Sequence, residues 1–152
     1  MNGRLAGQRV VLTQADVFMG PAIRELFETE GASVVADTRD LSPNVAAQSL
    51  IDDAGPTDSL VANLMLRNPR HLVPVTPDSE WLAMFDAMVH PLHRLVRAVL
   101  PQMMARRRGK IVVIGSANAL RGTSPRAAYG AARGAQLAYV RNAGIEVAPH
   151  GI

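Results

Sequence analysis

The sequence of 152 residues contains no cysteine. Without cysteine, a disulfide framework, a thiolate nucleophile and a zinc–thiolate site are all excluded. The absence of disulfides suits a reducing compartment, and we expect a cytoplasmic protein. His90 and His93 lie three positions apart. Two imidazoles without a cysteine are not a typical zinc site, so no metal is expected.

Long apolar runs and aromatic side chains are also scarce. No run approaches the roughly 18 apolar residues of a membrane helix, and the first ten residues lack the apolar core of a signal peptide. Two Tyr, one Trp and three Phe are too few for a surface that stacks on bases. The cluster Arg106 to Arg108 with Lys110, in a chain of net charge +3, is interpreted as the end of a helix. We therefore expect neither membrane nor nucleic acid as a partner.

Short β-branched segments alternate along the chain with helical ones, which predicts an α/β fold with a mostly parallel sheet between two helix layers. The length allows one domain over residues 1–152. The predicted strands are 9–13, 33–37, 59–63 and 110–115, and the predicted helices are 20–30, 41–54, 81–104 and 127–147. Only 22 positions (59 minus 37) separate the second and third of these strands. That space holds one helix, because a helix, a strand and a second helix need roughly 30 residues.

A serine, a phenol and a cation that could form one site follow the last predicted strand. Ser116 lies directly after it, Tyr129 comes thirteen positions later, and Arg133 lies four beyond Tyr129. Residues four apart share one face of a helix, so the phenol and the guanidinium are expected to meet. A fixed cation stabilises phenolate and lowers the tyrosine pKa from its usual value of about 10. Tyr129 is therefore the candidate general base.

Residues 110–133 resemble the active-site segment of the short-chain dehydrogenases/reductases, which place a serine after the fifth strand and then Tyr-x-x-x-Lys. This sequence has Arg133 in place of that lysine. The combination Ser-Tyr-Arg is similar to the halohydrin dehalogenases, a branch of the same superfamily that uses no nicotinamide. The resemblance implies a Rossmann-like three-layer fold, shortened at the third strand. It also implies that the last two strands are missing, so that the domain is incomplete at the C-terminus.

The turn at residues 13–20 supports the dehalogenase branch. In the dehydrogenases this turn carries three glycines that let the backbone approach a pyrophosphate, whereas here Gln14 and Phe18 take two places and only Gly20 is kept. In the dehalogenases an aromatic residue at the place of Phe18 helps to line the halide pocket; the alternative is that Phe18 packs in the core. Asp37 ends the second strand, where an acid would hold ribose hydroxyls.

The segment after the third predicted strand departs further from the dehydrogenases. Of their Asn-Asn-Ala-Gly motif only Asn63 is kept, and Met88 stands where they have a proton-relay asparagine. Leu64 and Met65 are candidates for the apolar wall of a substrate and halide pocket, or are packing residues. We therefore expect no cofactor. If the chain depends on NAD or NADP instead, the resemblance assigns Gly20, Asp37 and Asn63 to its binding.

The predicted function is conversion of vicinal halo alcohols to epoxides with release of halide, and opening of epoxides by small anions. Tyr129, Ser116 and Arg133 are the catalytic residues of this hypothesis. The alternatives are an NAD(P)-dependent short-chain oxidoreductase and a non-catalytic fragment or interaction module. The resemblance also implies a homo-oligomer that assembles through the helices 81–104 and 127–147.

Overall fold

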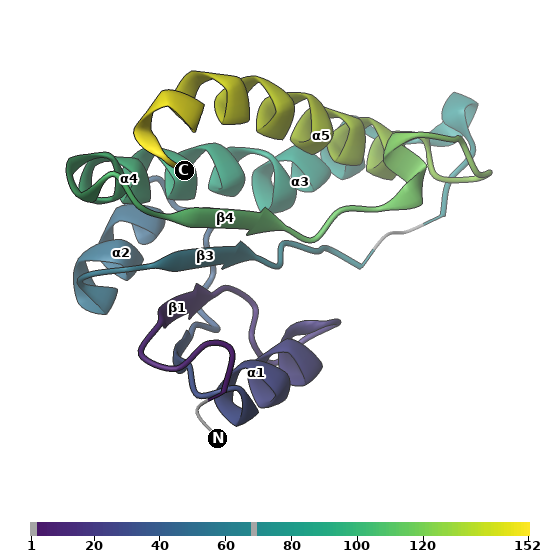
Figure 1. Ribbon diagram of the computed structural model, residues 1–152. Coiled ribbons are helices and arrows are strands. Elements are labelled where there is room, and N and C mark those ends of the chain that lie inside the picture. Colours follow the sequence, from purple (N-terminus) through teal and green to yellow (C-terminus); the bar gives the residue numbers. More distant parts are fainter. Residues whose placement is uncertain (1–2, 68–69) are drawn as a thin grey trace.

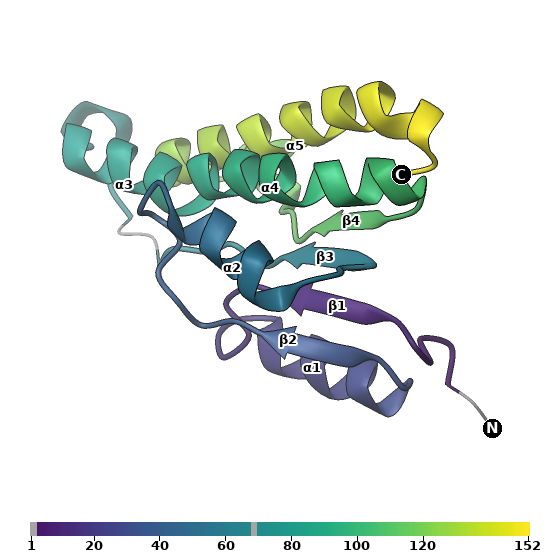
Figure 2. The ribbon, with the colours of Figure 1, turned by 90° about the vertical axis from the view of Figure 1, so that its left-hand side faces the viewer.

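The computed structural model describes residues 3–67 and 70–152 and contains one parallel sheet. Its strands are β1 (Arg9–Leu12), β2 (Ser33–Ala36), β3 (Ser59–Ala62) and β4 (Lys110–Val113). They lie in the order β2-β1-β3-β4 and every pair is parallel, with Leu12 opposite Ala36 on one side and Val61 on the other. Figure 2 shows the strands side by side, from β2 at one edge to β4 at the other.

Helices cover both faces of the sheet, which gives the predicted Rossmann-like three-layer α/β/α arrangement (Figure 1). The helix α1 (Gly20–Thr29) packs on one face, where Ile23 and Phe27 contact the buried side chains of Val10 and Leu12. The helices α2 (Ala46–Ala54) and α4 (His90–Arg106) supply the core on the other face. Successive strand residues point to opposite faces, and the burial of consecutive residues in β1 and β3 shows that both faces of these two central strands are covered.

The long helix predicted for residues 81–104 is wrong, because the structure has two helices there. They are α3 (Asp78–Met88) and α4, which meet at Val89. Pro91 occupies the first turn of α4. Proline has no backbone N–H and its ring collides with the preceding turn, so it suits a helix start and breaks a helix interior. Pro101, by contrast, is accommodated inside α4.

Of two other predicted helices, one begins later in the structure and one has the predicted bounds. The helix predicted for 41–54 begins only at Ala46, although Leu41 is still buried in the core. The helix α5 (Ala127–Val147) has the predicted bounds and packs on α3. In the described chain α2 leads directly into β3, as the short spacing predicts, so no further strand intervenes there.

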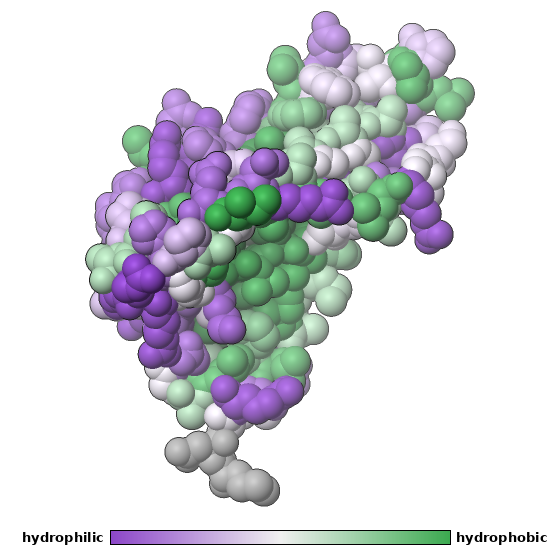
Figure 3. Space-filling model, turned by 45° about the horizontal axis from the view of Figure 1, so that its top comes forward, coloured by the Kyte–Doolittle hydropathy of each residue, from purple (hydrophilic) through white to green (hydrophobic). Residues whose placement is uncertain are grey.

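Apolar side chains also reach the surface. Val112 of β4 and Val140 of α5 are among the exposed large apolar residues, and one face of the molecule shows an apolar area bordered by polar ones (Figure 3). Within the described residues, no helix has the length and apolar character needed to cross a membrane.

Candidate active site

The structure brings Tyr129 and Arg133 together on α5, beside the end of β4. The Arg133 Nε donates a hydrogen bond to the Tyr129 hydroxyl at 3.1 Å, and its guanidinium lies 5.2 Å from the centre of the phenol ring. Ser116 follows β4 and begins a short 3-10 turn, where its Oγ accepts a hydrogen bond from the Asn118 N–H at 3.2 Å. The spacing of four residues places phenol and guanidinium on one helix face, as the sequence predicts.

The guanidinium of Arg133 is buried, with 2% of the residue exposed. Its Nη1 donates to the Ile114 carbonyl at 2.7 Å and to Gln136 Oε1 at 2.9 Å. Gln136 in turn donates from Nε2 to the Met88 carbonyl at 2.7 Å. Within the described residues every acceptor of Arg133 is uncharged, so the cation acts on the Tyr129 hydroxyl without a competing carboxylate.

The environment of Tyr129 lowers the pKa of its hydroxyl below the usual value. Partial burial alone raises this pKa, but hydrogen bonds from Ser116 and Arg133 and the positive charges of Arg133 and Arg126 together outweigh it. The cause is general: donors and cations beside a phenol favour its ionised form. The site can therefore hold a phenolate, or donate a proton, at a lower pH than a free tyrosine.

Two cavities lie next to these residues. One, of about 160 Å³, is lined by Ser116 and Arg133 together with apolar side chains, among them Leu120 and Leu137. The other, of about 450 Å³, lies between the loop at His71 and the loop that leads to α5, and Arg126 and Asn118 line it. A substrate in the first cavity would lie beside Ser116 and Arg133. A substrate in the second would lie beside Gly130, the residue that follows Tyr129.

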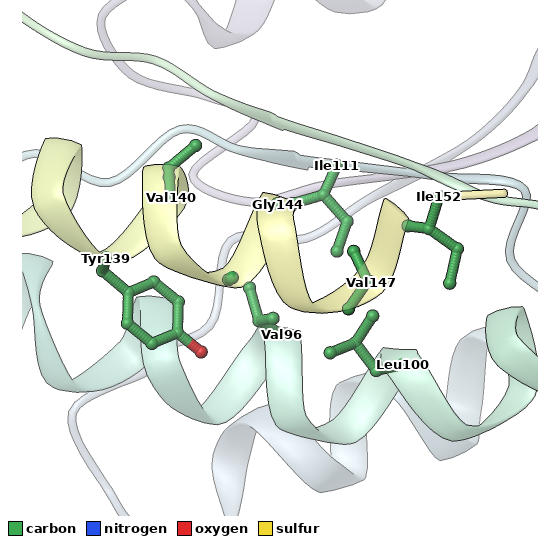
Figure 4. A pocket seen from close by; sticks show the side chains of 9 residues that line it. Val96, Leu100, Ile111, Tyr139, Val140, Gly144, Val147 and Ile152 are labelled. Carbon is green, nitrogen blue, oxygen red and sulfur yellow. The ribbon is translucent and has the colours of Figure 1, made fainter. Parts of the chain in front are cut away.

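A third cavity, of about 170 Å³, is enclosed by α4, α5, β4 and Ile152 and is almost wholly apolar (Figure 4). Tyr139 is its one titratable residue. Burial, together with the nearby Glu146, raises the pKa of the Tyr139 hydroxyl. Apart from this hydroxyl, the residues that line the cavity carry no group for acid–base chemistry.

The turn between β1 and α1 is built around two residues in the left-handed region. Gln14 has φ of 44° and Phe18 of 54°, which are values that glycine adopts without strain. Such a conformation costs another residue about 1–2 kcal/mol. Gly20 is required for a different reason, because a Cβ there would lie 2.4 Å from the Gln14 carbonyl oxygen. The turn thus keeps a glycine-like backbone although two of its three glycines are replaced.

The side chain of Gln14 crosses from the end of β1 to the segment after β3. Its Nε2 donates to the Met65 carbonyl at 3.0 Å, and its Oε1 accepts from the Met65 N–H at 2.8 Å. We call this pair of hydrogen bonds the crevice bridge. Asn63, fully buried, supports the same turn by donating to the carbonyls of Gln14 and Val17, both at 3.0 Å.

Three predicted pocket residues have other surroundings. Leu64 is 1% exposed and packs in the core under α2 and α4, so the prediction that it walls a substrate pocket is wrong. Phe18 is 56% exposed and therefore does not wall an enclosed halide pocket in this structure. Met65 is fixed through its backbone by the crevice bridge. The side chain of Phe18 is exposed to solvent, which its apolar character alone does not reveal.

Asp37 follows β2 and is only 6% exposed. Its Oδ1 accepts a hydrogen bond from Arg39 Nε at 2.5 Å, and Arg39 also reaches Asp53 of α2 at 3.1 Å. The Asp37 Oδ2 is buried and has no hydrogen-bond partner among the described residues. An acceptor left open at the end of a second strand is available to a hydroxyl of a bound ligand.

The sequence also matches a known family over nearly its whole length. The family model for short chain dehydrogenases matches residues 5–152. The chain belongs to this family. The 3-oxoacyl-acyl-carrier-protein reductase of Vibrio harveyi is 26% identical over 97% of this chain and 70% of its own length. The (-)-trans-carveol dehydrogenase of Rhodococcus erythropolis is 29% identical over 76% of this chain and 42% of its own length.

The solved structures show the same fold. A gluconate 5-dehydrogenase from Burkholderia cenocepacia, crystallised with NADP and tartrate, superposes with a TM-score of 0.90 at 22% identity, covering 98% of this chain and 69% of its own. These comparisons contradict the expectation of a cofactor-free protein. The matching family and the curated relatives are dehydrogenases and reductases, and this neighbour holds NADP. That expectation rested on the replaced glycines, but the turn keeps a glycine-like backbone without them.

The residues at the carboxyl edge of the sheet fit a dinucleotide in two respects. Asp37 offers a buried, open acceptor where an acid holds ribose hydroxyls, and the turn before Gly20 keeps its left-handed conformations. The Gln14 side chain opposes such a ligand, since it lies across the space between β1 and β3. Asp37 and the start of α1 are therefore the described parts of this edge whose chemistry fits such a group.

Sequence reasoning missed Gln136 and the pairing of Gln14 with Met65. Gln136 lies three positions after Arg133, and this spacing is the one signal that places both on the same face of α5. The partner of Gln14 is 51 positions away, so the sequence carries no local signal for it.

Proposed function

We propose that this chain is an NAD(P)-dependent short-chain oxidoreductase that interconverts a carbonyl compound and an alcohol. The observation that supports it most directly is the Tyr129 hydroxyl, which is held by Arg133 at 3.1 Å and has a lowered pKa. Membership of the dehydrogenase family supports the reaction class. In this proposal the nicotinamide supplies or accepts the hydride.

The chain's own residues handle the proton. In the direction of reduction the Tyr129 hydroxyl donates its proton to the substrate oxygen, and in oxidation the phenolate takes that proton back. The Ser116 hydroxyl holds the substrate oxygen beside Tyr129. Positioned proton transfer of this kind contributes about 10²–10⁴-fold to a rate. Arg133 acts through Tyr129, because its guanidinium is buried and its Nη1 is already engaged by Ile114 and Gln136.

Arginine at position 133 gives this site a character of its own. Lysine is a flexible point charge with a pKa that burial changes, whereas arginine stays charged and donates in fixed directions. Here those directions are taken by the Tyr129 hydroxyl, the Ile114 carbonyl and Gln136. The phenol therefore has a cation held beside it in a fixed direction.

The test is reduction of a panel of small ketones and 3-oxoacyl thioesters with NADH and NADPH, followed by loss of dinucleotide absorbance. Wild-type protein is expected to turn over at least one of them, and Tyr129→Phe to lose at least about 100-fold in rate while it still binds the dinucleotide. Unchanged turnover in Tyr129→Phe would sink the assigned role.

The halo-alcohol reaction predicted from the sequence rests on Arg133 and on the replaced glycines of the turn at residues 13–20, and none of the reported relatives is named for it. The same preparations decide the matter through a halide-release assay on a vicinal bromo alcohol. Release of bromide without added dinucleotide, abolished in Tyr129→Phe, would overturn the oxidoreductase proposal. We expect no such release.

We also propose that the chain forms a homo-oligomer through α3, α4 and α5. The small residues of α5, including Gly130 and Gly134, allow another helix to approach closely. Sedimentation of the purified protein measures this directly, and a monomer at all concentrations would contradict it.

A further inference from the structure

The crevice bridge lies where the course of the sheet changes direction. From β1 the chain crosses through α1 to β2 on one side, while β3 pairs with β1 on the other side. In open parallel sheets, ligands bind outside the carboxyl ends of the strands at such a point. Gln14 follows the carboxyl end of β1, and Met65 follows that of β3.

The crevice bridge closes this point with two hydrogen bonds that run in opposite directions between one side-chain amide and one backbone residue. The Gln14 carboxamide offers one donor and one acceptor, and the Met65 backbone returns one of each, at 3.0 and 2.8 Å. The Gln14 backbone is held as well, because its carbonyl accepts from Asn63 Nδ2 at 3.0 Å. The side chain is therefore fixed across the space between β1 and β3.

The backbone of Gln14 indicates that the residue has a role beyond the turn. A left-handed φ of 44° is unfavourable for a residue with a Cβ, and strained residues persist where surrounding contacts fix them. Glycine would relieve the strain but would remove both hydrogen bonds to Met65. The structure thus keeps a strained residue whose side chain blocks the place where the fold binds ligands.

We propose that Gln14 is a specificity-determining residue that closes the β1–β3 crevice and must release Met65 before a nicotinamide dinucleotide binds. The inference rests on the proposed function, since it concerns the same ligand. A bound dinucleotide has to compensate for two lost hydrogen bonds, so the wild-type chain binds it weakly. Ligands that leave the crevice bridge intact do not meet this cost.

The experiment measures the Kd of NADH and of NADPH by energy transfer from Trp81, the one tryptophan of the chain. Gln14→Gly opens the crevice, and Gln14→Met keeps the side-chain length but loses both hydrogen bonds. The control is Arg107→Gly, which relieves a left-handed residue of φ 51° at the end of α4, away from the carboxyl edge of the sheet. Thermal melts check that each variant folds.

Gln14→Gly is expected to bind at least about tenfold more tightly than wild type, Gln14→Met more tightly than wild type, and Arg107→Gly like wild type. Equal affinities in wild type and both Gln14 variants would overturn the inference and leave the proposed function standing. Binding by none of the four proteins would overturn the proposed function itself, and the inference with it.

A second readout does not depend on affinity. The Met65 amide hydrogen is held by Gln14 Oε1 in the free protein. Its hydrogen exchange is expected to be slow in wild type, faster in Gln14→Gly, and faster in wild type once the dinucleotide is bound. Slow exchange of this amide in the bound wild-type protein would show that the crevice bridge stays closed, which contradicts the proposal.

Discussion

The two tyrosines of this chain provide a direct test of the proposed acid–base site, because their environments act in opposite directions. Tyr129 has a lowered pKa and Tyr139 a raised one. A spectrophotometric titration that follows tyrosinate absorbance should therefore resolve two steps, one on each side of pH 10. The informative change is Arg133→Met, which removes the cation and the hydrogen bond of Nε to the Tyr129 hydroxyl.

The expected size follows from that contact. A hydrogen bond to a charged group contributes about 1.5–3 kcal/mol to the stability of that charged form. Tyr129 is only partly buried, and solvent screens such interactions, so the lower end applies. Arg133→Met is therefore expected to destabilise the Tyr129 phenolate by about 1.5 kcal/mol and so to raise the pKa of Tyr129, while the Tyr139 step stays where it is.

Two controls identify the steps. Tyr129→Phe should remove the lower step completely. Arg126→Met should move it less than Arg133→Met does, because Arg126 lies farther away, 5.9 Å from the ring centre, and contributes only through its charge. Arg133→Lys checks that a change in titration is not caused by loss of fold, since it keeps a cation at this place. A lower step that persists in Tyr129→Phe, or that stays unchanged in Arg133→Met, would refute the reasoning.

The same shift determines how stability depends on pH. Between the lowered pKa of Tyr129 and pH 10, the unfolded tyrosine holds a proton that the folded one has lost. Stability from this group therefore rises as the pH increases through that window, and is lost as the pH falls through the folded-state pKa. Urea unfolding on either side of the window should show this rise in wild type and a smaller one in Arg133→Met.

Two further substitutions test the scaffold of the site. Gly20→Ala places a Cβ 2.4 Å from the Gln14 carbonyl oxygen, so the variant should lose about 1–3 kcal/mol of unfolding free energy or more, and an unchanged urea midpoint would contradict the close approach. Gln136→Leu leaves the Met88 carbonyl and the Arg133 Nη1 short of a partner, with an expected loss of about 1–3 kcal/mol for each group left unsatisfied. Gln136→Glu, which keeps an acceptor for Arg133, serves as its matched control in the same unfolding assay.

Local patterns predicted much of this molecule. The four β-branched segments are the four strands, and the spacing of four residues brings Tyr129 and Arg133 into contact on α5. The apolar pattern does not indicate the break at Pro91, because it continues on both sides of this residue. The one local sign of the break is that proline has no backbone N–H. Leu64 and Phe18 were misplaced because an apolar side chain by itself does not indicate which way it points.

The expectation about the cofactor failed for a related reason. The presence of Gln14 and Phe18 in place of glycine predicts loss of the turn, but both residues adopt the left-handed conformation that glycine would have there. What changes is the side chain that each residue adds to that backbone. For Gln14 its direction depends on Met65, 51 positions away, and only the fold brings the two together.

The proline that divides α3 from α4 has an effect on chemistry as well as on shape. Where a helix is interrupted, its last carbonyls lose their usual partners, and one of these, on Met88, is taken up by Gln136. Gln136 also holds Arg133, which holds Tyr129. The Met88 carbonyl at the interruption thus holds Gln136 in place, and through Gln136 it supports the pair of Arg133 and Tyr129. A chain that straightened this helix would have to find its arginine a new support, so backbone break and reactive phenol can be expected to change together in evolution.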